Sequence, residues 1–87
     1  LNINHNDIGD DGAAALANSV NLPKLKIVTM FGNVVGDRGA QAFANSPQSK
    51  KYVKLDLFKN QYTDIGYKAL TESENLKNCE ELEVYRD

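Results

Sequence analysis

The sequence predicts an α/β fold in which short parallel strands and helices alternate along a right-handed repeat. First, similar residues recur at a constant interval, as at Asn6, Asn33 and Asn60, where 33 − 6 and 60 − 33 both equal 27. A period of this size is typical of repeat arrays. Second, each interval holds an alternating apolar–polar segment followed by a helical pattern. Strands that alternate with helices in this way form a parallel sheet.

Length and composition limit the classes of function. The 87 residues suffice for one domain, and they carry a net charge of −2, which does not favour binding to nucleic acid. No apolar run is long enough to span a bilayer, so we expect neither nucleic acid nor a membrane as partner. The single cysteine, Cys79, excludes an internal disulfide framework and favours a reducing compartment. The chain opens on a strand pattern without an initiator methionine, and we expect it to be an excerpt of a longer array.

Four segments show the alternation of a half-buried strand: residues 1–3, 28–30, 55–57 and 82–84. A period of two directs side chains such as Leu55 and Leu57 inward and turns the intervening ones to the opposite face. Asn6, Asn33 and Asn60 follow the strands at one equivalent position. An asparagine there can bond backbone groups that a bending chain leaves unpaired. We therefore expect a buried asparagine ladder.

A helix is expected to begin in each repeat at Asp10, Asp37 and Asp64, because aspartate is a strong N-cap. Four positions in each helix keep one class of residue and lie at i, i+3, i+4 and i+7, so we expect this face to pack against the sheet. The recurring glycine suggests close approach of another part of the chain, and the serines are expected to bond their own helix backbone. These positions are Gly12, Gly39 and Gly66; Ala15, Ala42 and Ala69; Leu16, Phe43 and Leu70; and Ser19, Ser46 and Ser73.

This frame resembles the leucine-rich repeat. Residues 8–17 read IGDDGAAALA and residues 35–44 read VGDRGAQAFA, which is similar to the ribonuclease-inhibitor-like subtype. Val28, Met30 and Phe43 depart from leucine, and we expect locally adjusted packing there. The resemblance implies a solenoid with a concave parallel sheet and outer helices, which binds other proteins across the concave face. The repeats would span residues 1–24, 25–51, 52–78 and a partial fourth, 79–87.

The solvent-facing strand positions form columns, because equivalent residues lie on adjacent strands roughly 5 Å apart. One column holds three aromatic residues, and exposed aromatics are enriched in binding hot spots. Alternatively, these rings only stack on one another across the strands. With the polar and charged residues around them, the candidate partner-binding residues are Asn4, Thr29, Phe31, Lys54, Asp56, Phe58, Lys59, Glu83, Tyr85 and Arg86.

No pattern of catalytic or metal-binding residues appears, so we expect no enzyme activity, no cofactor and no metal. His5 and Cys79 occupy different positions of the repeat and do not make a zinc site. The favoured function is a protein–protein interaction module. One alternative is regulation of a GTPase, because ribonuclease-inhibitor-like repeats also build the GTPase-activating protein of Ran; only Arg38 and Arg86 could stabilise charge there. Another alternative is a structural array that self-associates end to end.

Overall fold

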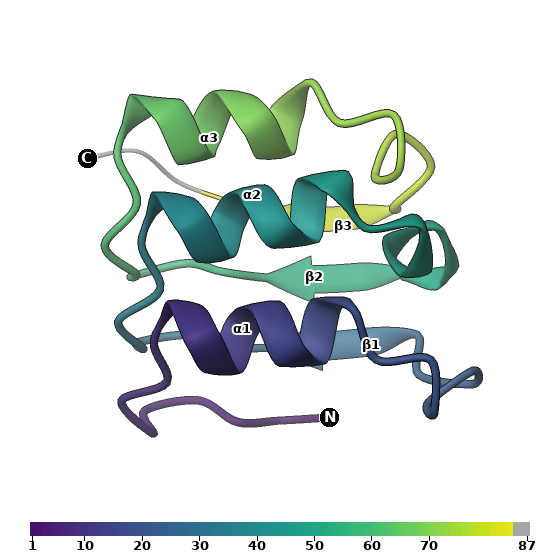
Figure 1. Ribbon diagram of the computed structural model, residues 1–87, viewed down its shortest axis with the longest axis horizontal. Coiled ribbons are helices and arrows are strands. Elements are labelled where there is room, and N and C mark those ends of the chain that lie inside the picture. Colours follow the sequence, from purple (N-terminus) through teal and green to yellow (C-terminus); the bar gives the residue numbers. More distant parts are fainter. Residues whose placement is uncertain (85–87) are drawn as a thin grey trace.

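The computed structural model describes residues 1–84 of the chain. Three helices lie side by side in one layer, and the strands form a second layer behind them (Figure 1). A short 3₁₀ helix, η1, follows the second helix. In chain order the elements are α1 (Asp10–Ala17), β1 (Ile27–Thr29), α2 (Asp37–Asn45), η1 (Pro47–Lys51), β2 (Lys54–Asp56), α3 (Asp64–Thr71) and β3 (Glu81–Glu83). The protein is therefore an α/β repeat, as predicted.

The sheet has the order β1-β2-β3, and both pairs of strands are parallel. Equivalent residues pair directly, so Val28 faces Leu55 and Leu55 faces Leu82. The prediction of a full strand over residues 1–3 is wrong, because this segment makes a single bridge from Asn2 to Thr29. It lies at the edge of the sheet, where pairing is possible on one side only.

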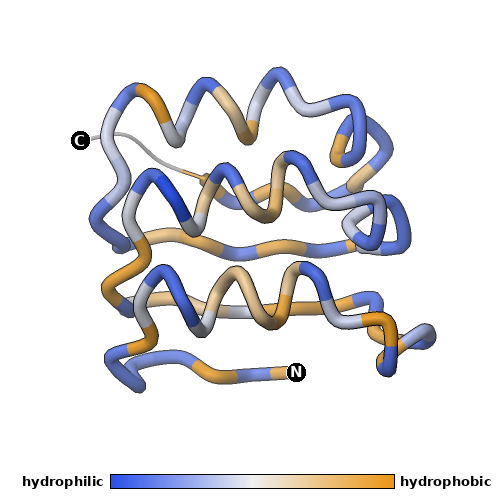
Figure 2. Tube along the Cα trace, in the orientation of Figure 1, coloured by the Kyte–Doolittle hydropathy of each residue, from blue (hydrophilic) through white to orange (hydrophobic). Residues whose placement is uncertain are grey.

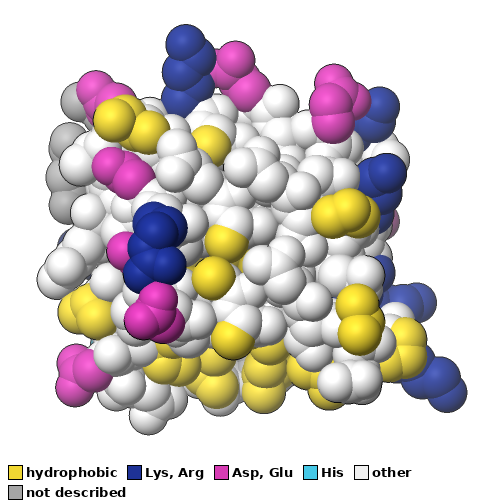
Figure 3. Space-filling model, in the orientation of Figure 1, with side chains coloured by type: hydrophobic (Ala, Val, Ile, Leu, Met, Phe, Trp, Pro, Cys, Tyr) yellow, Lys and Arg dark blue, Asp and Glu magenta, His cyan; other side chains and the backbone are white. Residues whose placement is uncertain are grey.

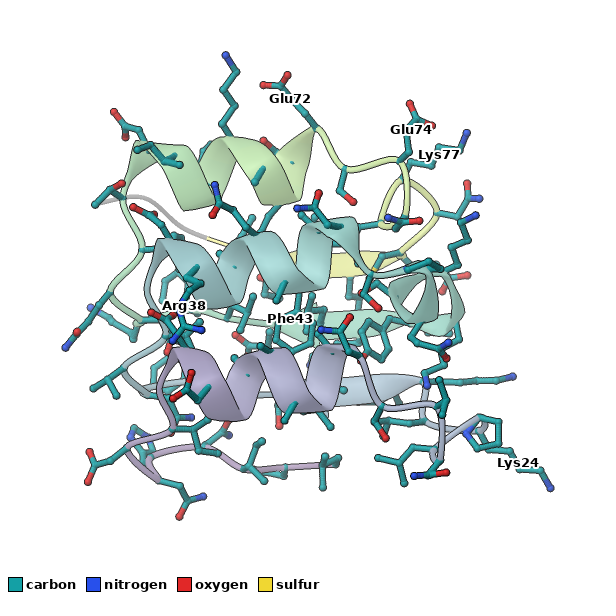
Figure 4. All side chains as sticks on the ribbon, viewed as in Figure 1. Lys24, Arg38, Phe43, Glu72, Glu74 and Lys77 are labelled. Atoms are coloured by element: carbon teal, nitrogen blue, oxygen red, sulfur yellow. The ribbon has the colours of Figure 1, made fainter. Side chains whose placement is uncertain are left out.

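The hydrophobic core lies between the two layers. Along the strands, hydrophobic and hydrophilic residues alternate (Figure 2), and the inward residues such as Leu55 and Leu57 are fully buried. Phe43 projects from α2 toward the strands (Figure 4) and is the largest fully buried side chain. The departures from leucine at Val28, Met30 and Phe43 all fill this core.

The predicted inward face of the helices is only partly correct. Gly39 and Phe43 are buried as expected, but Ala15 is exposed. The additional buried positions on α1 and α2 lie one residue further along each helical turn: Ala13, Ala17, Ala40 and Ala44. The helices pack side by side, and a helix with a neighbour buries a wider arc than the stripe that faces the sheet. Small alanine side chains suit this close packing.

The expected hydrogen bonds of Ser46 and Ser73 to their own helices are also wrong. Ser46 Oγ donates to Ala17 O at 2.7 Å, and Ser73 Oγ donates to Ala44 O at 2.5 Å. Each hydroxyl thus bonds a carbonyl at the end of the preceding repeat's helix, whose last carbonyls have no partner within the helix. Ser46 and Ser73 thus join neighbouring helices.

The aspartates do not cap their own helices either. Gly9, Gly36 and Thr63 are the N-caps. Asp10 Oδ1 instead accepts hydrogen bonds from the backbone N–H groups of Gly36 and Gly39 in the next repeat, at 2.7 and 2.9 Å. A Cβ at residue 39 would lie 2.8 Å from this oxygen, so glycine is required for the carboxylate to reach the backbone.

Candidate functional site

The candidate site is the face of the sheet that points away from the helices, here called the open face. Alternation along the strands buries Val28 and Leu55 and leaves residues on either side of them at this face. Parallel pairing then aligns these residues into rows across the strands. Ile27, Lys54 and Glu81 form one row, and Thr29, Asp56 and Glu83 form the next.

Beyond the carboxyl ends of β1 and β2, three rings form a continuous aromatic row: His5, Phe31 and Phe58. Phe31 and Phe58 are stacked with ring centroids 5.7 Å apart and planes inclined by 24°. His5 meets Phe31 edge-on at 5.3 Å. Lys59 Nζ lies 6.0 Å from the Phe58 centroid, within the range of a cation–π contact. Both predictions for the column of phenylalanines, ring stacking and a surface for binding, are compatible with the half-buried rings of Phe31 and Phe58.

The backbone after each strand explains why His5 joins this row. His5, Gly32 and Lys59 occupy equivalent positions and have φ of 58°, 73° and 59°, in the left-handed region that favours glycine. A Cβ at residue 32 would lie 2.5 Å from His5 Nδ1, so Gly32 leaves space for the imidazole. The sequence pattern alone does not place His5 in the site. Gly32, which occupies the equivalent position in the middle repeat, is the signal of unusual packing there.

Two of the predicted contact residues hold the phenylalanines in place through the backbone. Asn4 Oδ1 accepts a hydrogen bond from Phe31 N at 2.7 Å, and Asp56 Oδ1 accepts one from Phe58 N at 2.9 Å. Thr29 Oγ1 donates to Leu1 O at the longer distance of 3.4 Å. The polar residues beside the aromatic row therefore fix the rings and also present polar atoms at the open face.

The charged candidates lie on β2, β3 and the turn after β2. Lys54 Nζ is 3.6 Å from Glu81 Oε2, a partly exposed ion pair. Glu83 and Lys59 are exposed. The other two candidates, Tyr85 and Arg86, lie outside the described residues. The structure thus brings Phe31, Phe58 and the charged residues to one face.

The asparagine ladder lies beneath this face. Asn33 is only 4% exposed. Its Oδ1 accepts from the backbone N–H groups of Asn6 and Ile8, and its Nδ2 donates to the carbonyls of Ile3 and Met30. Asn60 Nδ2 also donates to Met30 O, at 2.9 Å. The asparagines therefore join consecutive repeats where each strand turns toward its helix. Asn6, at the end of the ladder, is exposed.

Other candidate chemical groups lie away from the aromatic row. Arg38 is at the start of α2 (Figure 4), where Arg38 Nη2 is 2.7 Å from Asp11 Oδ1. The hydrogen bond to Asp11 raises the pKa of Arg38 above its ordinary value. Burial raises the pKa of Cys79, whose Sγ donates to Val53 O at 3.4 Å. Within residues 1–84, no group of three or more His, Cys, Asp or Glu side chains could hold a metal ion.

The repeat features described above are also found in a known protein family. Residues 1–17 and 21–44 match the family described as Leucine Rich repeat. These two segments are similar to leucine-rich repeats. Their strand, asparagine and helix recur over residues 52–71 with the same register. Searches among curated proteins and among solved structures each found no match.

Leucine-rich repeat domains generally mediate protein–protein interaction, so the family suggests a protein as partner. Across the described part of the chain, none of the helices is long and apolar enough to cross a membrane.

Proposed function

We propose that this chain is a protein-binding module whose partner contacts the open face of the sheet. The observation that carries the proposal is the aromatic row, in which Phe31 and Phe58 stack at 5.7 Å and remain half-buried. Stacked rings are already ordered before a partner arrives, so little side-chain entropy is lost on binding. Large ordered aromatic side chains are the residues on which hot spots are commonly built.

The surroundings of the row support the same proposal. An interface typically has an apolar centre and a polar rim. Here Glu83 lies in the row next to the phenylalanines, and the Lys54–Glu81 pair lies in the following row of the open face. The rim charges would influence the rate of association and the choice of partner more than the affinity. Tyr85 and Arg86 are proposed as further members of the rim on the sequence pattern alone.

Within the leucine-rich repeats, we assign the chain to the ribonuclease-inhibitor-like subtype. The glycine, alanine and aspartate pattern after each asparagine supports this, and so does a helix of eight or nine residues in every repeat. This assignment implies that the repeats 1–24, 25–51, 52–78 and 79–87 follow a right-handed solenoid with the open face on its concave side.

Truncation of the rings tests the proposal. Proteins captured from an extract of the source cells by the unmodified chain are first identified, and their affinities are then measured with the purified partner. Phe31→Ala and Phe58→Ala should each keep the fold and weaken binding by about 2 kcal/mol, roughly thirtyfold. Circular dichroism and the denaturant midpoint report the fold.

Ile65→Ala is the matched control, because Ile65 is a large apolar residue that is 62% exposed on α3, in the helical layer. It should bind like the unmodified chain. Equal affinity of the phenylalanine variants and the unmodified chain would show that the partner binds elsewhere. Unfolding of Phe58→Ala would show that the ring belongs to the core.

A further inference from the structure

A second surface lies on the side of the molecule where the helices end and the chain returns to the sheet. Two connections meet there, residues 18–26 after α1 and residues 46–53 after α2. Together they contain four lysines, Lys24, Lys26, Lys50 and Lys51, and no aspartate or glutamate, although acidic residues outnumber basic ones in the whole chain. The side chains along this side include lysines interspersed with hydrophobic groups (Figure 3).

Hydrogen bonds hold the two connections together as one surface. Lys51 Nζ donates to Leu22 O at 2.7 Å, and Val53 N donates to Lys26 O at 2.7 Å. Lys51 thus has a structural role, and its aliphatic stem crosses from the second connection to the first. We call this surface the lysine–aliphatic edge, formed by Val20, Leu22, Lys24, Lys26, Lys50 and Val53.

The aliphatic members of this edge are unusually exposed. Val20 is 69% exposed and Leu22 42% exposed, and both lie in the connection that holds Lys24 and Lys26. Val53 is also exposed, and Ile27 continues the apolar surface onto the first residue of β1. A single exposed aliphatic residue is ordinary, but apolar groups gathered within a polar rim mark an interaction site.

The lysines of the edge are not explained by the rest of the fold. Neither α1 nor α2 has a basic residue in its last turn, so these lysines do not offset the helix dipoles from within the helices. Within residues 1–84, no ion pair involves Lys24, Lys26 or Lys50. The connection after α3, residues 72–80, differs because its lysine is in an ion pair: Lys77 is paired with Glu74 at 3.1 Å (Figure 4). Glutamates therefore bound the edge on that side.

We infer that the lysine–aliphatic edge binds an acidic amphipathic segment of another protein, with glutamate or aspartate on one face and leucine-type side chains on the other. The lysines complement the carboxylates, and the segment's aliphatic face would cover Val20 and Leu22, so charge and apolar surface are matched together. This surface adjoins the open face at Ile27, and its proposed role does not depend on binding at the aromatic row. Leucine-rich repeats generally bind proteins, which favours a protein segment as the occupant.

The test uses a short synthetic amphipathic helix of glutamate and leucine, labelled with a fluorophore. The unmodified protein should bind it, and binding should weaken as salt rises, because exposed charges are screened. The triple variant Lys24→Gln, Lys26→Gln, Lys50→Gln should bind about tenfold more weakly, as expected when complementary charges are lost. Val20→Ser should also weaken binding, by severalfold.

The control variant Arg38→Gln, Lys68→Gln, Lys77→Gln changes the net charge by the same amount and leaves the edge residues intact, so its binding should match that of the unmodified protein. Four results would overturn the inference. One is no binding of the glutamate–leucine helix, and another is an equal loss in both triple variants. The third is preferential binding to phosphatidylserine vesicles, which would indicate a lipid surface. Concentration-dependent sedimentation that is abolished only in the edge variant would also count against it, because the occupant would then be a second copy of the chain.

Discussion

The backbone N–H of Gly39 donates a 2.9 Å hydrogen bond to Oδ1 of Asp10, a residue of the preceding repeat. The same oxygen accepts from Gly36 at 2.7 Å, so one carboxylate satisfies donors at the start of the next helix. Asp37 makes the same bonds to Thr63 and Gly66, at 2.7 and 2.9 Å. The first turn of a helix has free N–H groups and a positive dipole end. The starts of α2 and α3 are therefore each capped from the repeat before them.

The first prediction concerns this link between repeats. Asp10→Ala should lower the free energy of unfolding by about 1 kcal/mol, as loss of a helix cap does. The denaturant midpoint measures the effect. Asp11→Ala is the control, because Asp11 is a neighbouring acid whose surface ion pair with Arg38 should contribute little. Equal midpoints for the two variants would mean that Asp10 does not couple the repeats.

The second prediction is that the free energy of unfolding depends on pH in the acidic range. Hydrogen bonds from the Thr63 hydroxyl, the Thr63 backbone and the Gly66 backbone lower the pKa of Asp37 below its ordinary value of 3.8. A carboxyl whose pKa is lower in the folded state stabilises the fold above its unfolded pKa, and this stabilisation is lost as the pH falls through the folded pKa. Unfolding followed from neutral to strongly acidic pH should show this loss.

Thr63→Val removes the largest cause of the lowered pKa, so its acid-induced loss of stability should be smaller. Thr71→Val provides the comparison, because the Thr71 hydroxyl bonds Tyr67 O within its own helix at 3.1 Å. If the acid profiles of Thr63→Val and the unmodified chain have the same shape, Asp37 is not the group that titrates.

The third prediction concerns the asparagine ladder. Asn33→Ala should cost about 1–3 kcal/mol, because it leaves backbone groups of two repeats buried without their partners. Asn6→Ala is the matched control, since Asn6 is exposed and its Nδ2 donates to Asn4 O, two residues away in the same repeat. An Asn33→Ala midpoint equal to that of Asn6→Ala would rule out a structural role for the buried rung.

The fourth prediction concerns the Tyr52 hydroxyl. Tyr52 is only 2% exposed, and within the described part of the chain its hydroxyl has no hydrogen-bond partner. Burial raises the pKa of Tyr52, so the phenol stays neutral at ordinary pH. A buried unpaired hydroxyl is unfavourable, and Tyr52→Phe should raise stability by about 1 kcal/mol. The half-buried Tyr67→Phe should leave the midpoint unchanged. A lower midpoint for Tyr52→Phe would show that a buried water satisfies the hydroxyl.

The sequence predicted the repeat spacing, the parallel order of strands and the inward leucines, because these follow from residue type and period alone. It did not predict the role of the aspartates. Asp10 occupies one position in the sequence whether it caps its own helix or the next one, and only the packing of two repeats decides between these arrangements. The same holds for Ser46 and Ser73, whose hydroxyls reach the neighbouring helix.

Periodicity also failed to separate the two buried sides of α2. Ala42 and Ala40 are both small, and a helical period cannot tell the side facing the sheet from the side that meets Gly66 of α3. For the open face, the column of Phe31 and Phe58 followed from the strand register. The position of His5 did not, because it depends on a left-handed turn and on the space beside Gly32.

The hydrogen bonds of the aspartates have a consequence for how such a chain can lengthen. Asp10 accepts from residues 26 and 29 positions ahead, and Asp37 accepts from residues at the same two offsets. A tandem duplication of residues 25–51 would shift every donor and acceptor by one period and keep both offsets. The new copy would receive its cap from the old one and provide a cap to the next. Genetic duplication of one unit can therefore enlarge the molecule without redesign of any junction.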